Sequence, residues 1–200
     1  MANEIELKYA LPYDFSESEI FSSVSGLIYG DIKTIEMHSI YFDTKDNLLA
    51  ASRTSLRLRR ENDLSVVTVK TPKDSSGALA NRGEWQVEAD SISSALPELS
   101  KTDSPEIIFS FSENELVVVA EFSFTRKMAY VKAADFEAEL CVDIGYLSPD
   151  GKLKAPLCEL EIELKSGDVS ALCKFGDELC TKFSLKPEFL SKLTRARNLK

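Results

Sequence analysis

The stretch that decides the fold lies near the amino terminus and reads Asn3-Glu4-Ile5-Glu6-Leu7-Lys8-Tyr9. Charged and apolar side chains alternate along it, which is the period-two pattern of a β-strand with one apolar face and one ionic face. Two carboxylates and an amine therefore share one face. Because strands exposed to solvent also carry charges, this stretch alone does not distinguish a solvated sheet from a charged cavity.

The same alternation recurs along most of the chain. Arginine, lysine and glutamate take every second position, and leucine, valine, isoleucine or tryptophan fill the positions between them. The segments with this pattern are residues 55–60, 65–70, 82–88, 136–143 and 159–165. Each is predicted to be a strand with one ionic face, and the ionic faces carry both signs of charge.

Two architectures agree with this pattern. In the first, an open antiparallel sheet packs its apolar face on helices and turns its charged face to water. In the second, the sheet closes into a barrel or tunnel with the charged faces inside and helices over the apolar outer faces. Such an interior must stay hydrated, pair its charges or bind ions, because an unpaired buried charge is very costly. A lining of arginine, lysine and glutamate suits a polyanion bound with a divalent cation.

Composition limits the class of protein. The length of 200 residues suits one domain, residues 1–200, and the net charge of −9 argues against a nucleic-acid partner. The four cysteines lack CxxC spacing, so reduced thiols are expected. With His38 as the only histidine, a zinc site is not expected. A bound metal should be hard and oxygen-ligated, which favours Mg²⁺ or Mn²⁺.

The sequence predicts a cytoplasmic protein without a membrane partner. The acidic amino terminus leads directly into a strand, unlike a signal peptide, and the most apolar run, residues 116–120, is too short to cross a bilayer.

An α+β organisation follows from the remaining signals. Ser16 and Glu19 form a capping-box pattern that predicts a helix ending near Gly30. Residues 73–83 are predicted to be a mobile polar loop. Further helices are expected at 94–99, 105–111, 168–183 and 187–197, further strands at 36–43, 117–124, 127–133 and 135–144, and turns at Asp46-Asn47 and Asp150-Gly151. The prediction is about eight antiparallel strands with helices packed around them.

Several motifs in one order resemble those of the CYTH superfamily, the triphosphate tunnel metalloenzymes, and most closely its bacterial inorganic triphosphatase branch. They are Glu4-Ile5-Glu6-Leu7-Lys8, Tyr41-Phe42-Asp43-Thr44, Leu56-Arg57-Leu58-Arg59, Thr68-Val69-Lys70, Cys158-Glu159-Leu160-Glu161-Ile162-Glu163-Leu164 and Ser191-Lys192-Leu193-Thr194-Arg195-Ala196. Ala196 departs from the family's glycine. The resemblance implies an eight-stranded antiparallel β-barrel with a charged interior and helices outside. Relatives in this branch often carry a further helical domain after the tunnel.

The resemblance also implies roles for individual residues. Those expected to bind phosphate are Lys8, Arg57, Arg59, Lys70, Arg82, Arg126, Lys192 and Arg195. Those expected to hold the metal are Glu4, Glu6, Asp143, Glu159, Glu161 and Glu163, and those expected to be catalytic are Glu4, Glu6, Lys8, Glu161 and Glu163. Alternatives stay open: Arg82 as a solvated charge, Glu84 and Glu88 as partners of tunnel arginines, and Lys165 as exposed.

The resemblance implies metal-dependent hydrolysis of inorganic triphosphate (tripolyphosphate) to pyrophosphate and phosphate. The alternatives on this scaffold are thiamine-triphosphatase activity, adenylate cyclase activity, or a non-catalytic module that binds polyphosphate or nucleotide. The expected partner is a small-molecule triphosphate, and the chain is expected to be a monomer or homodimer. The sequence does not identify the general base.

Overall fold

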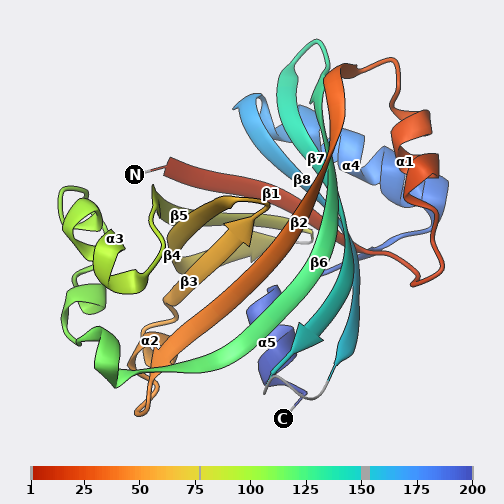
Figure 1. Ribbon diagram of the computed structural model, residues 1–200. Coiled ribbons are helices and arrows are strands. Elements are labelled where there is room, and N and C mark those ends of the chain that lie inside the picture. The colour runs from red at the N-terminus through yellow and green to blue at the C-terminus, as the bar shows by residue number, and fades with distance from the viewer. Residues whose placement is uncertain (1, 77, 150–153, 200) are drawn as a thin grey trace.

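The strands close into a barrel (Figure 1). A computed structural model describes residues 2–76, 78–149 and 154–199. Neighbouring strands run antiparallel in the order β5-β4-β3-β2-β6-β7-β8-β1, and β5 pairs with β1 to close the circle. The strands are β1 (Ala2–Ala10), β2 (Ile28–Thr44), β3 (Ser55–Glu61), β4 (Leu64–Ser76), β5 (Leu79–Glu88), β6 (Leu116–Lys132), β7 (Phe136–Ser148) and β8 (Ala155–Gly167). The predicted eight-stranded antiparallel barrel is confirmed.

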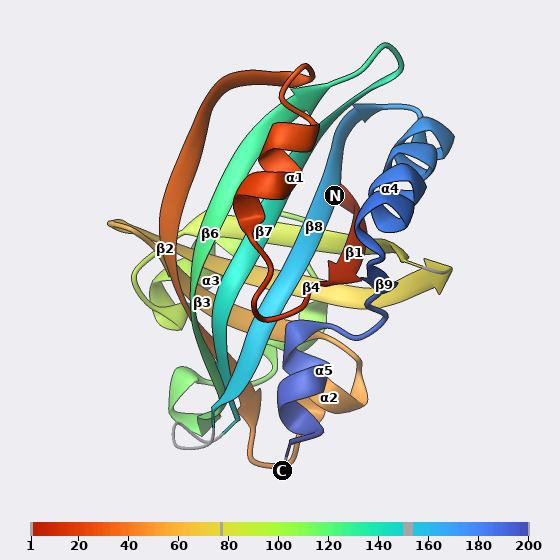
Figure 2. The same cartoon turned by 90° about the vertical axis from the view of Figure 1, so that its right-hand side faces the viewer.

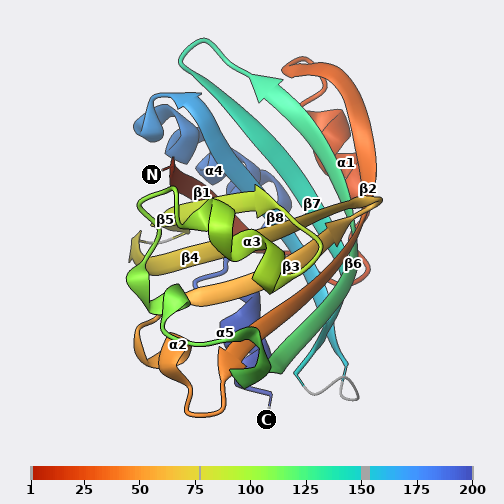
Figure 3. The same ribbon diagram turned by 60° about the vertical axis from the view of Figure 1, so that its left-hand side comes forward.

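Two groups of helices cover the apolar outer faces of the barrel. α1 (Glu17–Ser23) and α4 (Val169–Phe183) lie over β6, β7, β8 and β1, where Ile20 and Leu172 pack against the outward side chains of Leu140 and Ile162 (Figure 2). α3 (Ile92–Leu99) covers β3, β4 and β5 and buries Trp85 (Figure 3). Because the apolar faces of the strands pack against these helices, the ionic faces of the strands point into the lumen.

The short α5 (Lys192–Arg197) closes one end of the barrel with an apolar layer. Its Leu193 and Ala196 belong to one buried cluster with Tyr41, Phe122 and Leu157, which stand on the inner faces of β2, β6 and β8. The lumen is therefore not ionic along its whole length. The strand pattern did not predict this end, because the alternation of charges stops before these aromatic and leucine positions.

Four predictions about where elements begin or end are wrong. The first helix ends at Ser23, because the long β2 begins at Ile28 and includes Gly30 at a bulge where φ is +74°. The two strands predicted at 117–124 and 127–133 are one continuous strand, β6, which carries Arg126 in its middle. β6 pairs continuously with β2 and β7 through residues 125–127, so the strand does not break at the polar residues between the two predicted strands.

The segment predicted as a loop at 73–83 is mostly strand, since β4 continues to Ser76 and β5 starts at Leu79. The last helix starts at Lys192 with Ser191 as its N-cap, because a two-residue strand, β9 (Lys186–Pro187), pairs with the end of β1 instead. The predicted turn at Asp150-Gly151 lies outside the described residues. None of the described helices combines the length and apolar character needed to cross a membrane.

Candidate active site

The barrel encloses a cavity of about 610 Å³. The predicted site residues that line it are Glu4, Glu6, Lys8, Arg57, Arg59, Lys70, Arg82, Arg126, Glu161, Glu163 and Lys192. Because successive residues of a strand point to opposite faces, the ionic stripes of the sequence converge on one space. Asp143 and Glu159 are fully buried behind this lining, and Arg195 does not line the cavity.

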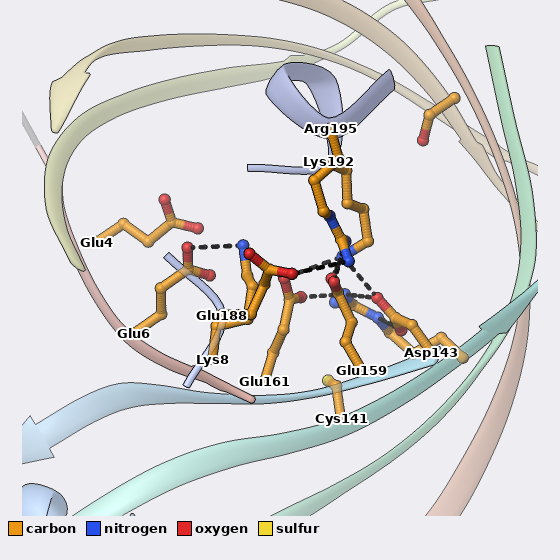
Figure 4. Close-up of polar contacts among 12 residues, drawn as sticks. Glu4, Glu6, Lys8, Cys141, Asp143, Glu159, Glu161, Glu188, Lys192 and Arg195 are labelled. Atoms are coloured by element: carbon orange, nitrogen blue, oxygen red, sulfur yellow. Dashed lines mark hydrogen bonds and ion pairs between the residues drawn. The ribbon is translucent and has the colours of Figure 1, made fainter. Parts of the chain in front are cut away.

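Glu161 on β8 is the centre of an ionic network on one wall. Its carboxylate accepts hydrogen bonds from Arg126 Nη2 at 2.6 Å and Lys192 Nζ at 2.9 Å, and Lys8 Nζ lies 3.4 Å away (Figure 4). Burial raises the pKa of this carboxyl, but Lys192, Lys8 and Arg126 more than offset that effect and hold it well below its usual range. Glu161 is therefore ionised.

Asp143 on β7 and Glu159 on β8 complete an acidic cluster with Glu161. One carboxylate oxygen from each of the three lies within 4.8 Å of the others. Arg126 donates two hydrogen bonds to the carboxylate of Asp143, from Nε at 2.7 Å and from Nη2 at 2.8 Å. Lys192 Nζ lies 2.9 Å from Oδ2 of Asp143. Lys192 comes from α5, so the helix that closes the barrel also supplies a cation to the cluster.

Glu159 is the least favourably ionised member of this cluster. Burial raises its pKa, and the nearby Glu161 carboxylate adds to the effect, while Lys192 and Lys8 oppose it. Arg195 of α5 forms ion pairs with Glu159 and with Glu188, and these contacts keep its guanidinium behind the cavity wall.

A second set of carboxylates lies nearer β5. Glu4 forms ion pairs with Arg82 and, at 2.6 Å, with Lys70 Nζ; Arg82 Nη2 also donates to Glu6 at 2.8 Å. Arg82 is thus part of the lumen and not a solvated charge. Glu163 completes this set beside Glu6 in the β1–β8 register.

The carboxylates fit a hard divalent cation by their chemistry. Glu163 has its pKa raised by burial and by the charges of Glu4 and Glu139, although Lys165 lowers it with a contact at 2.8 Å. A cation would relieve this repulsion, and carboxylate oxygens are the ligands that Mg²⁺ and Mn²⁺ prefer. Glu4, Glu6, Glu161 and Glu163 could hold it from the cavity side, and Asp143 and Glu159 from behind.

The opposite wall is cationic. Arg57 Nη2 donates to Thr68 Oγ1 at 3.0 Å, but its buried Nε has no hydrogen-bond partner, and no ion pair joins Arg57 to a carboxylate of the described residues. Arg59 Nε donates to Ser39 at 3.0 Å, and its only described carboxylate contact is Glu61 at 3.4 Å. Burial and the charges of Arg57 and Arg126 lower the pKa of Arg59. Two guanidinium groups with so few carboxylate contacts among the described residues suit an anionic ligand.

Further residues line the cavity beyond those to which the sequence assigned a role in the site. Tyr41 lies beside the arginine wall, and Arg57 and Arg59 lower the pKa of its hydroxyl although burial raises it. Lys165 is exposed, as predicted, with 37% of its side chain accessible, and it also lines the cavity. Its position on the same face of β8 as Glu163 accounts for the second observation. Glu139, Arg53 and Arg197 also line the cavity.

The acidic network makes stability depend on pH. In chelator-treated protein, we expect the melting temperature to fall as the pH drops below about 4.5, because the pKa values of Glu4 and Glu161 are lowered in the folded state. The unfolded chain then takes up protons at a higher pH than the folded chain, so stability present above that value is lost on acidification. Thermal melts followed by circular dichroism between about pH 7 and pH 3 test this expectation. A melting temperature that stayed constant or rose over this range would contradict it.

A closed antiparallel barrel that sets arginines against carboxylates around one cavity defines a tunnel protein suited to binding a polyanion. The CYTH domain family model matches residues 2–196, and the chain belongs to this family. The match covers nearly every described element of the barrel, including α5.

Individual relatives are more distant. The chain is 25% identical over 179 residues to an inorganic triphosphatase of Haemophilus influenzae, covering 90% of this chain but half of that protein. A solved structure from Hippeastrum, described as an adenylyl cyclase candidate that reveals a dominant triphosphatase activity, is 21% identical with a TM-score of 0.70 and covers 98% of this chain and 96% of its own. A Pyrococcus horikoshii protein is 19% identical with a TM-score of 0.60, covering 98% and 99%. The two structures share the fold with this chain.

Proposed function

We propose that the chain hydrolyses inorganic triphosphate to pyrophosphate and phosphate with the help of Mg²⁺ or Mn²⁺. The observation that carries the proposal is the division of the cavity into two walls. Arg57 and Arg59 present cationic groups that have few carboxylate partners among the described residues, while Glu4, Glu6, Glu161 and Glu163 face them from β1 and β8. The likeness to the Haemophilus protein supports the choice of substrate.

The two walls perform different parts of the reaction. Tripolyphosphate carries roughly four negative charges near neutral pH, and arginine forks match its oxygens at two points each. Lys8, Lys70 and Lys192, which are paired with carboxylates of the lumen, add compact positive charges. A divalent cation bound by the carboxylates supplies neutralisation of phosphate charge and a more acidic water. In the hydrolysis, water attacks the terminal phosphorus in line, the P–O bond to the next phosphate breaks, and a glutamate accepts the proton.

The charged character of the cavity lining supports the unadorned phosphate chain over a nucleotide. The ring of charged residues surrounds the lumen, and α5 closes one end with apolar side chains. The runner-up is a thiamine-triphosphatase or adenylate cyclase, in which an organic group would extend through the open part of the cavity.

A substrate panel tests the proposal. Purified protein is incubated with tripolyphosphate, ATP or thiamine triphosphate, with Mg²⁺ or Mn²⁺, and the products are separated by ion chromatography. We expect pyrophosphate and phosphate from tripolyphosphate at the highest kcat/KM, and no turnover after chelation. If cyclic AMP forms from ATP faster than phosphate is released from tripolyphosphate, the chain is an adenylate cyclase and the proposal is wrong. Metal-dependent binding of tripolyphosphate without any turnover would make the chain a binding module.

A further inference from the structure

Arg53 adopts a backbone conformation that does not suit an arginine. Its φ is +56°, in the left-handed region that glycine enters freely and that other residues avoid because of their Cβ atom. The residue follows α2 (Leu48–Ala51), where its N–H donates to the carbonyl of Ala50 at 3.0 Å. Glycine is the usual residue at such a position after a helix. Asn47, Asn62 and Ser184, the other described non-glycine residues with positive φ, are small and polar.

The main chain at Arg53 is fixed to the barrel by a buried carboxylate. Asp43, at the end of β2, is fully buried, and it accepts hydrogen bonds from the N–H of Leu49 at 2.9 Å and of Ala50 at 3.1 Å. Its Oδ2 also accepts from Arg197 Nη2 of α5 at 2.9 Å. Asp43 therefore holds α2 beside α5, and Arg53 cannot relax its backbone by moving the short helix away.

The side chain of Arg53 borders the tunnel. It lines the cavity together with Ala50 and Thr54 of the α2 region and with Phe189 and Leu190, which precede α5. The residue is exposed, and no ion pair joins it to a described carboxylate. Arg57 and Arg59 of β3 line the same cavity, so Arg53 adds a third guanidinium to its wall on the α2 side.

We propose that Arg53 binds the end of the phosphate chain that lies nearest α2 and the segment before α5. This inference rests on the proposed function and adds to it a residue that governs substrate affinity. The guanidinium donates charge-assisted hydrogen bonds to the outermost phosphate, or to the departing product, from a fixed backbone position. A glycine at this position would remove the backbone strain, but it would also remove the Arg53 guanidinium from the cavity wall.

Variants that separate backbone strain from charge test the inference. Tripolyphosphate binding is measured by calorimetry, with metal present, for wild type, Arg53→Gly and Arg53→Asn. We expect Kd to rise about tenfold for both variants, the effect of losing one charge-assisted interaction. The melting temperature of Arg53→Gly should stay unchanged or rise by about 2–4 °C, because glycine relieves the strain. Asn47→Gly, at the start of the same helix with φ +58°, is the matched control and should bind as wild type does.

The outcomes are distinguishable. Wild-type affinity in both Arg53 variants, or an equal loss of affinity in Asn47→Gly, would overturn the role of Arg53. If wild type binds tripolyphosphate without hydrolysing it and the Arg53 variants bind it tenfold more weakly, the proposed function fails and the role of Arg53 stands. A wild-type protein that does not bind tripolyphosphate at all would overturn both.

Discussion

Replacing Glu161 by glutamine is expected to lower kcat for tripolyphosphate by about 10²–10³-fold, while the affinity for tripolyphosphate changes far less. The carboxylate of Glu161 is in contact with Arg126, Lys192 and Lys8, and it belongs to the acidic cluster with Asp143 and Glu159. Glutamine keeps the size of the side chain but removes the charge that a divalent cation and the three protein cations require. The loss should therefore appear in turnover and in metal affinity.

The measurement combines steady-state kinetics with titration of Mn²⁺ followed by electron paramagnetic resonance. Glu137→Gln is a suitable control, because Glu137 lies on the same sheet and pairs with Lys132, but does not line the cavity. It should keep wild-type kcat and Mn²⁺ affinity. A Glu161→Gln protein that is folded, turns over at the wild-type rate and binds Mn²⁺ equally well would contradict the assignment of this wall.

Replacing Arg57 by alanine is expected to have the opposite profile, with tripolyphosphate affinity about 10²-fold weaker. The side chain is 6% exposed, its Nε lacks a hydrogen-bond partner, and no described carboxylate neutralises it. A phosphate oxygen that meets this fork makes two charge-assisted hydrogen bonds, each contributing about 1.5 kcal/mol or more. Because the free protein gains little from Arg57, most of this loss should appear in binding.

Arg60→Ala provides the matched control for Arg57→Ala. Arg60 stands three residues further along β3, and 66% of its side chain is exposed on the outer face, near Asp63. Calorimetry on both variants should therefore show a loss only for Arg57→Ala. Equal weakening in the two variants would mean that general surface charge, and not the arginine wall, attracts the anion.

The strands and their ionic faces were predictable because the charged positions of six segments share one period. Glu4, Arg57, Lys70 and Glu161 stand on different strands, yet strict alternation gives each an inward direction once the sheet closes. Closure itself was not in the pattern: an open sheet has the same alternation, and the register of β5 with β1 decides between them. The motifs of the family supplied that choice.

Other features could not be derived from strand patterns. The apolar end of the lumen depends on where α5 packs, and Leu193 and Ala196 meet Phe122 only through tertiary contacts. Arg195 shares a motif with Lys192, but the turn of α5 directs Lys192 into the cavity and Arg195 toward Glu159 and Glu188. The role proposed for Arg53 could not be predicted from the sequence for a different reason. It depends on a positive φ angle, and no pattern in the neighbouring residues indicates one.

The most direct test of the account is a crystal structure of the protein grown with tripolyphosphate and Mn²⁺, with the metal located by its anomalous scattering. The account predicts phosphate oxygens on the guanidinium groups of Arg57 and Arg59, and the anomalous peak among the carboxylates of β1 and β8. Tripolyphosphate bound only on the outer surface, with Arg57, Arg59 and the carboxylates of the lumen keeping the contacts that they have in the free protein, would contradict it.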